Sequence, residues 1–429
     1  MVRKKKKKKR RLKKLPLAIL ILLLLVGCGY IIYQNRDKIN IDLKPVKEVI
    51  DYESFYDKTV IIKNDTKMYL FDNDKYTDAG TIYKDTLVSL TNEVDEDNNY
   101  FKIKDLGGKY FIKYGDFEVT DNAYENDKRY LKYIPFNNNI VTNDKVTIYL
   151  DDNKLYTLNE SLNLPIIIKK KDRYYVEYNS MLVYILKDDV KEVVGNKNTD
   201  KGNTRGVPVL NYHFVYKPED ERCNQEICHT VDQFRTHLSY IKDNGYFTPT
   251  MAELEMYIDG EVQLPSSVVI TIDDGRNVNL ASELLEEYQL NATAFIVTGR
   301  FNMERDFKRS PYVEFQSHSH NLHNAGSCPP GHGQGGGLTC FKDEDILNDL
   351  KTSRDILGGA TAFCYPFYEY NTHAIELLKQ AGFTMGFAGE YTGGKTKAVV
   401  GIDKFRIPRW VIVNYTTMNE FISYVSGRA

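Results

Sequence analysis

The chain has 429 residues and a formal net charge of −2, but this near balance hides an uneven distribution. Eleven of its 57 Lys and Arg residues lie within the first 14 positions, so the remainder carries 46 basic against 59 acidic residues, a net charge of −13. This acidic main part excludes a nucleic-acid-binding protein and argues against recognition of a polyanion by net charge.

A run of basic residues and a run of mostly apolar residues open the chain. The eleven basic side chains lie in residues 1–14, and the apolar run covers residues 15–33. Nineteen residues in a helix span about 28 Å, which is enough to cross the hydrocarbon core of a bilayer. Because basic flanks stay on the cytoplasmic side, we expect 1–14 to be a cytoplasmic tail and 15–33 a single transmembrane anchor in the cell membrane. The rest of the chain is then extracytoplasmic.

The segment Leu25-Val26-Gly27-Cys28 also looks like a bacterial lipoprotein processing site. In that alternative a lipid on Cys28 replaces the helix as the anchor. Residues 29–33 continue the apolar stretch where a lipidated N-terminus normally turns polar, so we favour the uncleaved helix. Both alternatives tether the protein to the outer face of the membrane.

Residues 34–56 read as a polar stalk, and two related segments follow it at 57–122 and 137–194. Short Tyr-, Ile- and Val-rich strands between Asn, Asp and Gly turns predict a small antiparallel barrel in each, which we interpret as two SH3-like modules. They are similar to wall-binding modules of bacterial surface enzymes, but their tyrosines either stack on sugar rings or pack a small core. Wall binding and a plain spacer both stay open. The matching stretches are 67–76 with 147–156, 99–103 with 173–177, and 109–114 with 182–186.

Residues 195–206 form a polar linker, and residues 207–429 alternate between apolar strands and amphipathic helices. This alternation predicts an α/β domain with a parallel sheet closed into a barrel. We expect strands at 207–213, 268–272, 292–298, 312–315, 362–365, 385–388 and 407–413, and helices at 231–244, 251–258, around 280–285, and at 343–357, 372–381 and 418–425.

Two adjacent carboxylates, Asp273 and Asp274, follow the most apolar of these strands. The C-terminal ends of strands are where ligands and chemistry gather in α/β folds. Neighbouring side chains on a strand point in opposite directions, so the two carboxylates can take two roles only if the backbone turns there. Gly275 permits that turn.

The strand at 312–315 runs into a segment with three imidazoles, His318, His320 and His323. Packing alone does not account for them, because each buried ring needs a partner for both nitrogens. A metal supplies one partner. An aspartate with two histidines is a ligand set suited to zinc, with positions left open for water and substrate. We therefore expect the ends of the two strands to meet at a metal site.

These two segments resemble the signature motifs of the polysaccharide deacetylases, also called the NodB homology domain or carbohydrate esterase family four. VVITIDDG at 268–275 is similar to their TFDDG motif, and SHSHNLH at 317–323 to their H-[ST]-x-x-x-H motif. The resemblance covers about residues 206 to 425 and implies an irregular (β/α)7 barrel. It also implies that Asp274, His318 and His323 hold a divalent metal, with zinc expected, and that Asp273 is the general base. His320 is assigned a place beside the site or in solvent.

The sequence departs from the family pattern where many members have an R-x-P-Y motif, whose arginine orients the base. The matching stretch here is Cys364-Tyr365-Pro366-Phe367, without an arginine. Arg409 or Arg406 is expected to stand in, because a base without a cationic neighbour would be poorly held. The candidate substrate-binding residues are Tyr365, Pro366, Phe367 and Trp410.

The late histidine that is the family's usual general acid is also missing, since no histidine follows His373. His213 is the candidate substitute. The opening VPVLNYHFV looks like the circularly permuted deacetylases, including those acting on poly-N-acetylglucosamine, in which the first strand supplies this histidine. The alternative is a purely structural histidine at a strand end. The candidate catalytic residues are therefore Asp273, His213 and Arg409.

The spacing of the cysteines favours two loop disulfides, Cys223 with Cys228 and Cys328 with Cys340, which an extracytoplasmic location permits. A second zinc site with His229 or His332 is the alternative. Cys364 lies in an apolar strand and is expected to be a small core residue. The glycine-rich insertion between Cys328 and Cys340 lacks a phosphate-loop lysine, so we expect a surface loop and no nucleotide partner.

The resulting hypothesis is a membrane-anchored, metal-dependent polysaccharide N-deacetylase whose substrate is peptidoglycan or a related polymer such as poly-N-acetylglucosamine. An O-acetyl polysaccharide esterase is the nearest enzymatic alternative. A non-catalytic wall-binding protein is the alternative from another class, but the intact set of Asp273, Asp274, His318 and His323 speaks against it.

Overall fold

The structure is a computed structural model that describes residues 50–124, 128–196, 202–203, 205–389 and 396–428. The predicted cytoplasmic tail, the predicted anchor and residues 34–49 of the predicted stalk lie outside these ranges. Among the described residues, no helix is long and apolar enough to span a bilayer.

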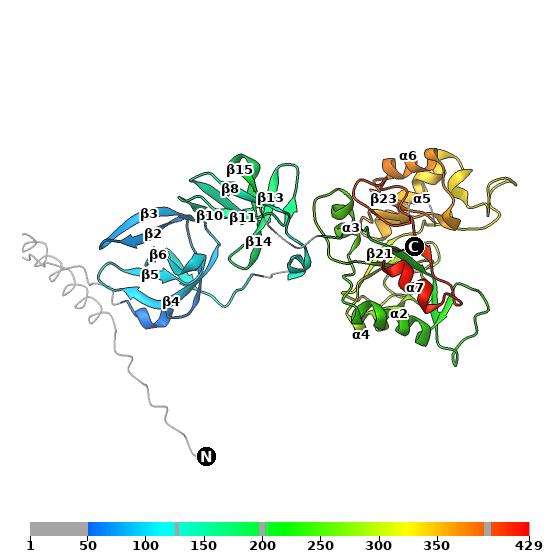
Figure 1. The fold of residues 1–429 in the computed structure, drawn as a ribbon, viewed down its shortest axis with the longest axis horizontal. Helices are drawn as coiled ribbons and strands as arrows, with labels where there is room; N and C mark the ends of the chain where they lie inside the picture. The colour runs from blue at the N-terminus through cyan, green and yellow to red at the C-terminus, as the bar shows by residue number, and fades with distance from the viewer. Residues whose placement is uncertain (1–49, 125–127, 197–201, 204, 390–395, 429) are drawn as a thin grey trace, which may run out of the picture. The chain divides into compact units, whose positions relative to one another are not determined.

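The first half of the described chain is a β-rich region built from antiparallel strands (Figure 1). Twelve of its strands form one sheet in the order β12-β13-β14-β9-β10-β3-β2-β6-β5-β4-β1-β7, and three form a second sheet in the order β11-β8-β15. The strands are β1 Thr59–Ile62, β2 Thr66–Asp72, β3 Lys75–Ile82, β4 Leu87–Asp95, β5 Tyr100–Ile103, β6 Tyr110–Lys113, β7 Phe117–Val119, β8 Asn138–Thr142, β9 Val146–Leu150, β10 Asn153–Leu158, β11 Asn163–Pro165, β12 Ile168–Lys169, β13 Arg173–Tyr178, β14 Met181–Leu186 and β15 Val190–Gly195.

The two sequence repeats share the larger sheet, because β10 of the second repeat pairs with β3 of the first. Gly80 is paired with Leu158 and has a φ of 141°. A Cβ atom at this position would lie 2.0 Å from the backbone oxygen of Thr157. Only glycine allows the two strands to approach this closely.

The C-terminal part of the chain is an α/β domain whose central sheet has seven parallel strands in the order β23-β22-β21-β20-β19-β16-β24. Two further strands, β17 and β18, form a small parallel pair beside it. The strands are β16 Val209–Tyr212, β17 Phe214–Tyr216, β18 Cys228–Thr230, β19 Val269–Ile272, β20 Ala292–Ile296, β21 Val313–Ser317, β22 Ala362–Cys364, β23 Met385–Phe387 and β24 Trp410–Val411. The helices are α2 Val231–Asp243, α3 Met251–Ile258, α4 Val278–Tyr288, α5 Asp343–Ile356, α6 Thr372–Ala381 and α7 Met418–Val425.

The predicted α/β class and parallel sheet are confirmed, and the sheet is a half-barrel. A single parallel bridge, between Phe387 and Ile407, links the end of β23 to the segment that precedes β24. The parallel pairing brings the C-terminal ends of the seven strands to one edge. Any chemistry carried on those ends is therefore gathered in one place.

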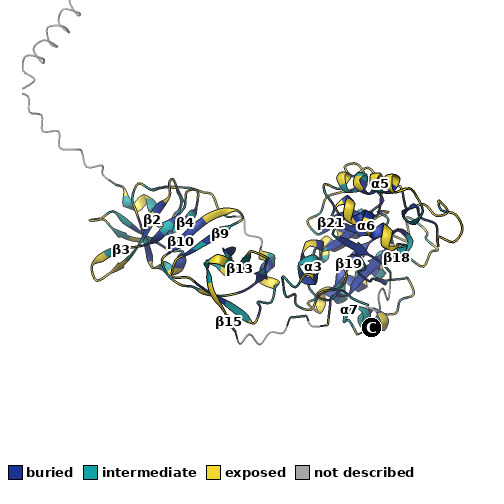
Figure 2. Ribbon diagram, turned by 90° about the horizontal axis from the view of Figure 1, so that it is seen from above, coloured by how far each residue is buried: buried dark blue, intermediate teal, exposed yellow. Residues whose placement is uncertain are grey.

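The apolar run of β19 is explained by burial on both faces. Ile270 and Ile272 pack in a cluster with Leu238 of α2 and Leu285 of α4. Val269 packs in a second cluster that contains Phe295 and other strand residues. Figure 2 shows β19 in the colour of buried residues and α5 with exposed residues along its outer side. A strand covered on both faces needs apolar side chains at every position.

The helices begin where the sequence offers capping residues. Thr230, Thr250 and Thr417 each accept a hydrogen bond from the backbone of the third helical residue, whose Gln or Glu side chain caps back. This capping box satisfies N–H groups that have no partner inside the helix. It fixes the residues at which α2, α3 and α7 begin.

Replacing Ile270 by Ala will lower the free energy of unfolding by about 2–5 kcal/mol, because it removes a fully buried side chain from a packed core. The same replacement at Ile356, which is 43% exposed at the end of α5, is the matched control. Its effect will stay within about 0.5 kcal/mol. Urea denaturation of the two variants measures both values, and equal losses would contradict the assignment of the core.

Acidification will destabilise the C-terminal domain through two buried histidines. Burial lowers the pKa of both His229 and His237 to about 4. An unfolded histidine titrates near pH 6.5. Between pH 6.5 and 4 the unfolded state therefore binds protons, whereas these two histidines stay unprotonated in the folded state. Stability will therefore fall with pH across this window, by roughly 1.4 kcal/mol per pH unit for each histidine. Thermal unfolding from pH 7 to 4.5 tests this, and a slope unchanged in His229→Leu would contradict it.

Candidate active site

The strand β19 ends in a sharp turn that separates its two carboxylates. Asp274 adopts a left-handed conformation with a φ of 71°, and Gly275 follows with a φ of 93°. A non-glycine residue in this conformation is strained, and such strain concentrates at functional sites. The Asp273 side chain is 1% exposed, whereas Asp274 is partly exposed. The turn thus directs Asp273 into the domain and Asp274 toward the opening of the site.

Asp274 meets the two predicted histidine ligands at the edge of the sheet. Its Oδ1 atom lies 3.5 Å from Nε2 of His318 and 3.4 Å from Nε2 of His323. This oxygen is buried and accepts no hydrogen bond within the described residues. The Nδ1 atom of His318 lies 2.9 Å from the backbone oxygen of Cys364. A proton on Nδ1 leaves the Nε2 lone pair free for a metal.

The three side chains fit a divalent cation by their spacing and their chemistry. Their ligand atoms all lie within 4.8 Å of one another. A tetrahedral ion with bonds of about 2.1 Å holds its ligand atoms about 3.4 Å apart, which agrees with the two contacts of Asp274. One carboxylate and two imidazoles leave further positions for water and substrate. A buried oxygen without a hydrogen-bond donor is the polar group that such an ion would satisfy.

The protonation states agree with this interpretation. Burial would raise the pKa of Asp274, but the neighbouring His318, His213 and His323 outweigh it and lower the pKa to about 2. Burial lowers the pKa of His323 to about 4. Burial would also lower the pKa of His318, but Cys364 and the two aspartates raise it well above its usual value.

Asp273 belongs to a different cluster, held by Arg409. The Arg409 guanidinium is fully buried and donates from Nη1 to Oδ1 of Asp273 at 2.8 Å. Its other nitrogens reach the backbone oxygen of Ala388 and the sulfur of Cys364, at 3.1 and 2.9 Å. Burial would raise the pKa of Asp273, but the charges of Arg409, His318 and His213 outweigh it and hold the pKa well below its usual range. Asp273 is therefore an ionised carboxylate with a fixed orientation.

A second potential ligand group, Asp273 with His318 and Cys364, also has its ligand atoms within 4.8 Å. The guanidinium of Arg409 already contacts both Asp273 and Cys364 in this group. A cation placed there would face an arginine at close range, and like charges repel strongly in a buried site. The structure therefore favours the group of Asp274, His318 and His323.

The loop that carries the histidines is held by contacts that the sequence did not reveal. Asp349 of α5 accepts hydrogen bonds from the backbone nitrogens of His320 and Asn321, at 2.8 and 2.5 Å. Gly299 donates from its backbone nitrogen to the backbone oxygen of His320. A Cβ atom on Gly299 would lie 2.2 Å from the side chain of Asn321. These contacts fix the loop in the shape that brings His318 and His323 together.

Some of the remaining predicted residues lie near the site and others do not. His213 follows β16 and is close enough to the site for Asp273 and Asp274 to raise its pKa, although burial outweighs them and lowers it overall. Its buried Nδ1 atom has no hydrogen-bond partner among the residues that the structure describes. The ring of Phe367 lies 4.4 Å from that of His323, on a short turn that begins with Pro366. His213 and Phe367 therefore both lie close to the candidate metal ligands.

Two of the predicted substrate-binding residues are core residues instead. Tyr365 is fully buried, and its hydroxyl donates to the backbone oxygen of Phe405 at 2.8 Å. Trp410 is 4% exposed and stacks on Tyr424 of α7, with ring centroids 4.3 Å apart. Both rings lie on the side of their strands that packs against a core, so substrate cannot reach them. This part of the prediction is corrected.

Three other predicted roles are also resolved by position. Arg406 pairs with Asp403 at 3.6 Å, so Arg409 is the arginine that contacts Asp273. His320 points its Nδ1 atom to the hydroxyl of Thr298 at 3.0 Å and stays off the group of ligands. Cys364 is buried as expected, but its sulfur also donates to Oδ2 of Asp273 at 3.3 Å. It is part of the site rather than a neutral core residue.

Tyr368 is a further site residue that the sequence analysis missed. Its hydroxyl donates to Oδ1 of Asn211 at 2.7 Å, and its ring centroid lies 5.5 Å from the guanidinium carbon of Arg409. Cys364 could have been found from sequence, because it occupies the place of the missing arginine in the R-x-P-Y comparison. Asp349, Gly299 and Tyr368 carry no such signal.

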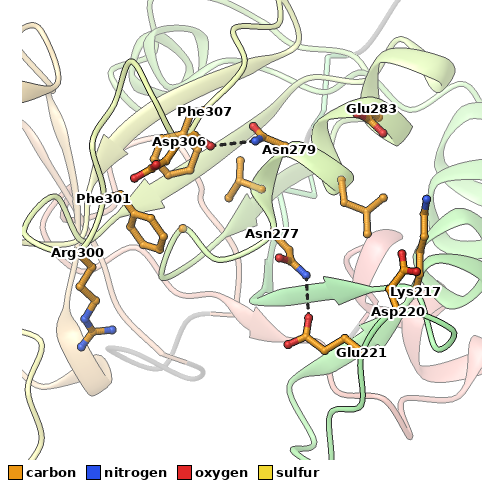
Figure 3. A pocket seen from close by; sticks show the side chains of 13 residues that line it. Lys217, Asp220, Glu221, Asn277, Asn279, Glu283, Arg300, Phe301, Asp306 and Phe307 are labelled. Atoms are coloured by element: carbon orange, nitrogen blue, oxygen red, sulfur yellow. Dashed lines mark hydrogen bonds between the residues drawn. The ribbon is translucent and has the colours of Figure 1, made fainter.

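A pocket of about 890 Å³ lies near the candidate site, although none of the three candidate metal ligands lines it. Gly275, next to Asp274, lines it, and the guanidinium of Arg300 at its wall donates to the backbone oxygen of His323. Figure 3 shows Arg300 and Phe301 on one side of the pocket and Glu221 on the other. The mixture of charged groups and an aromatic ring suits a polar ligand with apolar faces, as sugars are.

The two expected disulfides are present, one between Cys223 and Cys228 and one between Cys328 and Cys340. The second closes the glycine-rich loop, whose Gly336 and Gly337 lie against Phe367 and Leu322. The loop therefore packs beside the histidine segment.

Comparison with known proteins agrees with this site. The family described as Polysaccharide deacetylase matches residues 261–386. The chain is 25% identical over 190 residues to YxkH of Bacillus subtilis, which its name assigns provisionally to the polysaccharide deacetylases. That match covers 43% of this chain and 64% of YxkH.

The chain is also 24% identical over 235 residues to the poly-beta-1,6-N-acetyl-D-glucosamine N-deacetylase of Staphylococcus aureus, covering 47% of this chain and 77% of that protein. Among solved structures, the Streptococcus pyogenes deacetylase PplD in complex with acetate matches with 19% identity and a TM-score of 0.42, over 51% of this chain and 98% of that one. The C-terminal half of the chain is a polysaccharide deacetylase domain of carbohydrate esterase family four, a hydrolase family that is typically metal-dependent.

Replacing His323 by Ala will lower the affinity for zinc by at least about tenfold to hundredfold, because one of the three ligand atoms is lost. His320→Ala is the matched control, since this imidazole lies in the same loop but contacts Thr298. Its zinc affinity will stay within about threefold of the parent chain. Calorimetric titration of the metal-free chain with zinc checks both, and equal losses in the two variants would contradict the assignment.

Proposed function

We propose that the chain is a zinc-dependent N-deacetylase that removes acetyl groups from N-acetylglucosamine residues of a cell-surface polysaccharide. The observation that carries this proposal is the division of labour between two adjacent carboxylates. Asp274 turns to His318 and His323, whereas Asp273 turns to Arg409. An amide hydrolase of this type needs both a metal ligand and a separate base at one point.

A zinc ion on Asp274, His318 and His323 would supply Lewis acidity to a water molecule and to the amide carbonyl. Asp273 accepts the proton of the attacking water, and Arg409 keeps this carboxylate ionised and oriented. His213 would donate a proton to the departing amine nitrogen, a role that rests on its place after β16 beside the two aspartates. The products are acetate and a free amine on the sugar.

The substrate class is supported by the pocket and by the relatives. The pocket of about 890 Å³ beside Gly275 is large enough for more than one sugar ring. A relative with 24% identity carries the name of a poly-N-acetylglucosamine N-deacetylase. Peptidoglycan and poly-N-acetylglucosamine share the N-acetylglucosamine unit, so either polymer carries the acetamide group on which the proposed reaction acts.

The location that we propose is the outer face of the cell membrane. The basic tail and apolar run of residues 1–33 support a single-pass anchor with its N-terminus inside. The two disulfides agree with an extracytoplasmic domain. We interpret the β-rich region as two SH3-like modules that stand between the anchor and the deacetylase domain.

Replacing Asp273 by Asn will lower the rate of acetate release from an N-acetylglucosamine hexamer by about 10²–10⁴-fold, because the base is lost. Zinc content will remain at one equivalent, since Asp273 is not a ligand. Asp355→Asn, an exposed carboxylate on α5, is the matched control and will keep full activity.

Acetate from acetylated xylan in place of the hexamer would indicate an O-acetyl esterase. Full activity of Asp273→Asn would contradict the proposed mechanism.

A further inference from the structure

The first repeat carries five aromatic rings on the side of its strands that faces away from the core. Strand residues alternate between two faces, and the core face of this repeat holds Met68, Phe101 and Ile112, which are fully buried. Their strand neighbours point the other way. We call this set the aromatic face: Tyr69 and Phe71 of β2, Tyr76 of β3, Tyr100 of β5 and Phe111 of β6.

The rings of the aromatic face contact one another; Phe71 is exposed, and the other four rings are partly buried. Tyr76 stacks on Tyr100 with ring centroids 3.9 Å apart, and Tyr69 meets Tyr100 at 5.1 Å. Phe71 lies 4.7 Å from Tyr76 and is 46% exposed. The β2–β3 hairpin and the strands β5 and β6 that carry these rings are labelled in Figure 1. A cluster of large rings that is only partly buried, with Phe71 exposed, is typical of an interaction surface.

The second repeat shows what covers the matching rings. Tyr69 pairs with Phe111 between β2 and β6, and Tyr149 pairs in the same way with Tyr184 between β9 and β14. The rings of Tyr149 and Tyr184 stack at 5.0 Å, and the guanidinium of Arg173 lies 4.2 Å above Tyr184. The second repeat therefore covers its own rings with a cation.

The first repeat lacks this internal cation. When Phe111 is matched to Tyr184, the strand registers place Tyr100 of β5 where the second repeat has Arg173 of β13. Within the part of the chain that the structure describes, no Lys or Arg lies over any of the five rings of the aromatic face. A surface that accepts a guanidinium in one repeat is thus left for an external cation in the other.

The charges around the aromatic face favour a cationic ligand. The β2–β3 turn carries Asp72 and Asp74, and the β4–β5 turn carries Asp95 and Asp97. The hydroxyl of Tyr76 donates to Oδ2 of Asp95 at 2.9 Å, which ties the second acidic turn to the rings.

The cations on the same part of the repeat are fewer. Lys102 is paired with Glu93 at 2.6 Å and Lys67 with Asp78 at 2.5 Å, which leaves Lys75 and Lys113 as the neighbouring positive charges without such a pair. Four aspartates against these two lysines leave the surroundings of the rings acidic.

We propose that the aromatic face binds an aminosugar chain with free amino groups, which is the product of the deacetylation proposed above and rests on it. The apolar faces of the sugar rings stack on the aromatic side chains. The protonated amines interact with the rings and with the acidic turns. An acetylated chain offers the same sugar faces but no positive charge. The repeat therefore keeps the enzyme on stretches of polymer that it has already deacetylated.

The test compares two hexamers of the same sugar backbone, glucosamine and N-acetylglucosamine. Calorimetric binding is measured with the full chain carrying Asp273→Asn, so that the acetylated hexamer is not consumed. The glucosamine hexamer will bind at least about tenfold tighter, and its affinity will fall as salt rises. Phe71→Ala and Tyr69→Ala will each weaken this binding by about tenfold.

Tyr149→Ala is the matched control for Tyr69→Ala, because it removes the equivalent ring from the repeat that is covered by Arg173. It will leave the affinity unchanged. The double variant Asp72→Asn, Asp74→Asn touches only an exposed turn and will weaken binding of the glucosamine hexamer alone, which guards against loss of fold in the ring variants. Equal binding of the two hexamers, or unchanged binding in Phe71→Ala, would overturn the proposal.

Binding of the glucosamine hexamer tests the aromatic face, and acetate release tests the proposed function, so the two can fail separately. A chain that binds the glucosamine hexamer through Phe71 but releases no acetate would contradict the proposed function and leave the binding site intact. A chain that releases acetate but binds equally well without Phe71 would contradict the binding site alone.

Discussion

The buried ion pair between Asp273 and Arg409 is the interaction on which the site depends. Both side chains are almost fully buried, and their atoms are 2.8 Å apart. Each charge is held in the core by the other, because an unpaired charge is costly in a buried site. The pair also holds Asp273 against Arg409 while Asp274 faces His318 and His323, and the proposed division between a base and a metal ligand rests on this arrangement. The left-handed turn at Asp274 makes this separation possible within two residues.

The sequence predicted most of the fold because its local signals agree with one another. The apolar strand before Asp273 is buried on both faces, as its unbroken β-branched run indicates. The helices α3, α6 and α7 begin and end at the residues expected for them. The pairing of β10 with β3 was not predictable, because periodicity does not reveal which strands of two repeats become neighbours.

The candidate site was predictable where chemistry is encoded in a motif and unpredictable where it depends on tertiary contact. Asp274, His318 and His323 converge as expected. Tyr365 and Trp410 were misassigned, because an aromatic residue beside a motif is as suited to the core as to a ligand, and only the strand face decides. Asp349 is far from the motifs in sequence and reaches the histidine loop only through the packing of α5. The aromatic face of the first repeat was visible as a tyrosine-rich pattern, but its exposure needed the structure.

The most direct measurement of the central claim is anomalous X-ray diffraction at the zinc edge on crystals of the zinc-loaded chain. The account predicts one strong peak bonded to Asp274, His318 and His323, with Asp273 held by Arg409 and outside the bonding distance of the ion. A peak on Asp273 and Cys364, or no peak among these side chains, would contradict it.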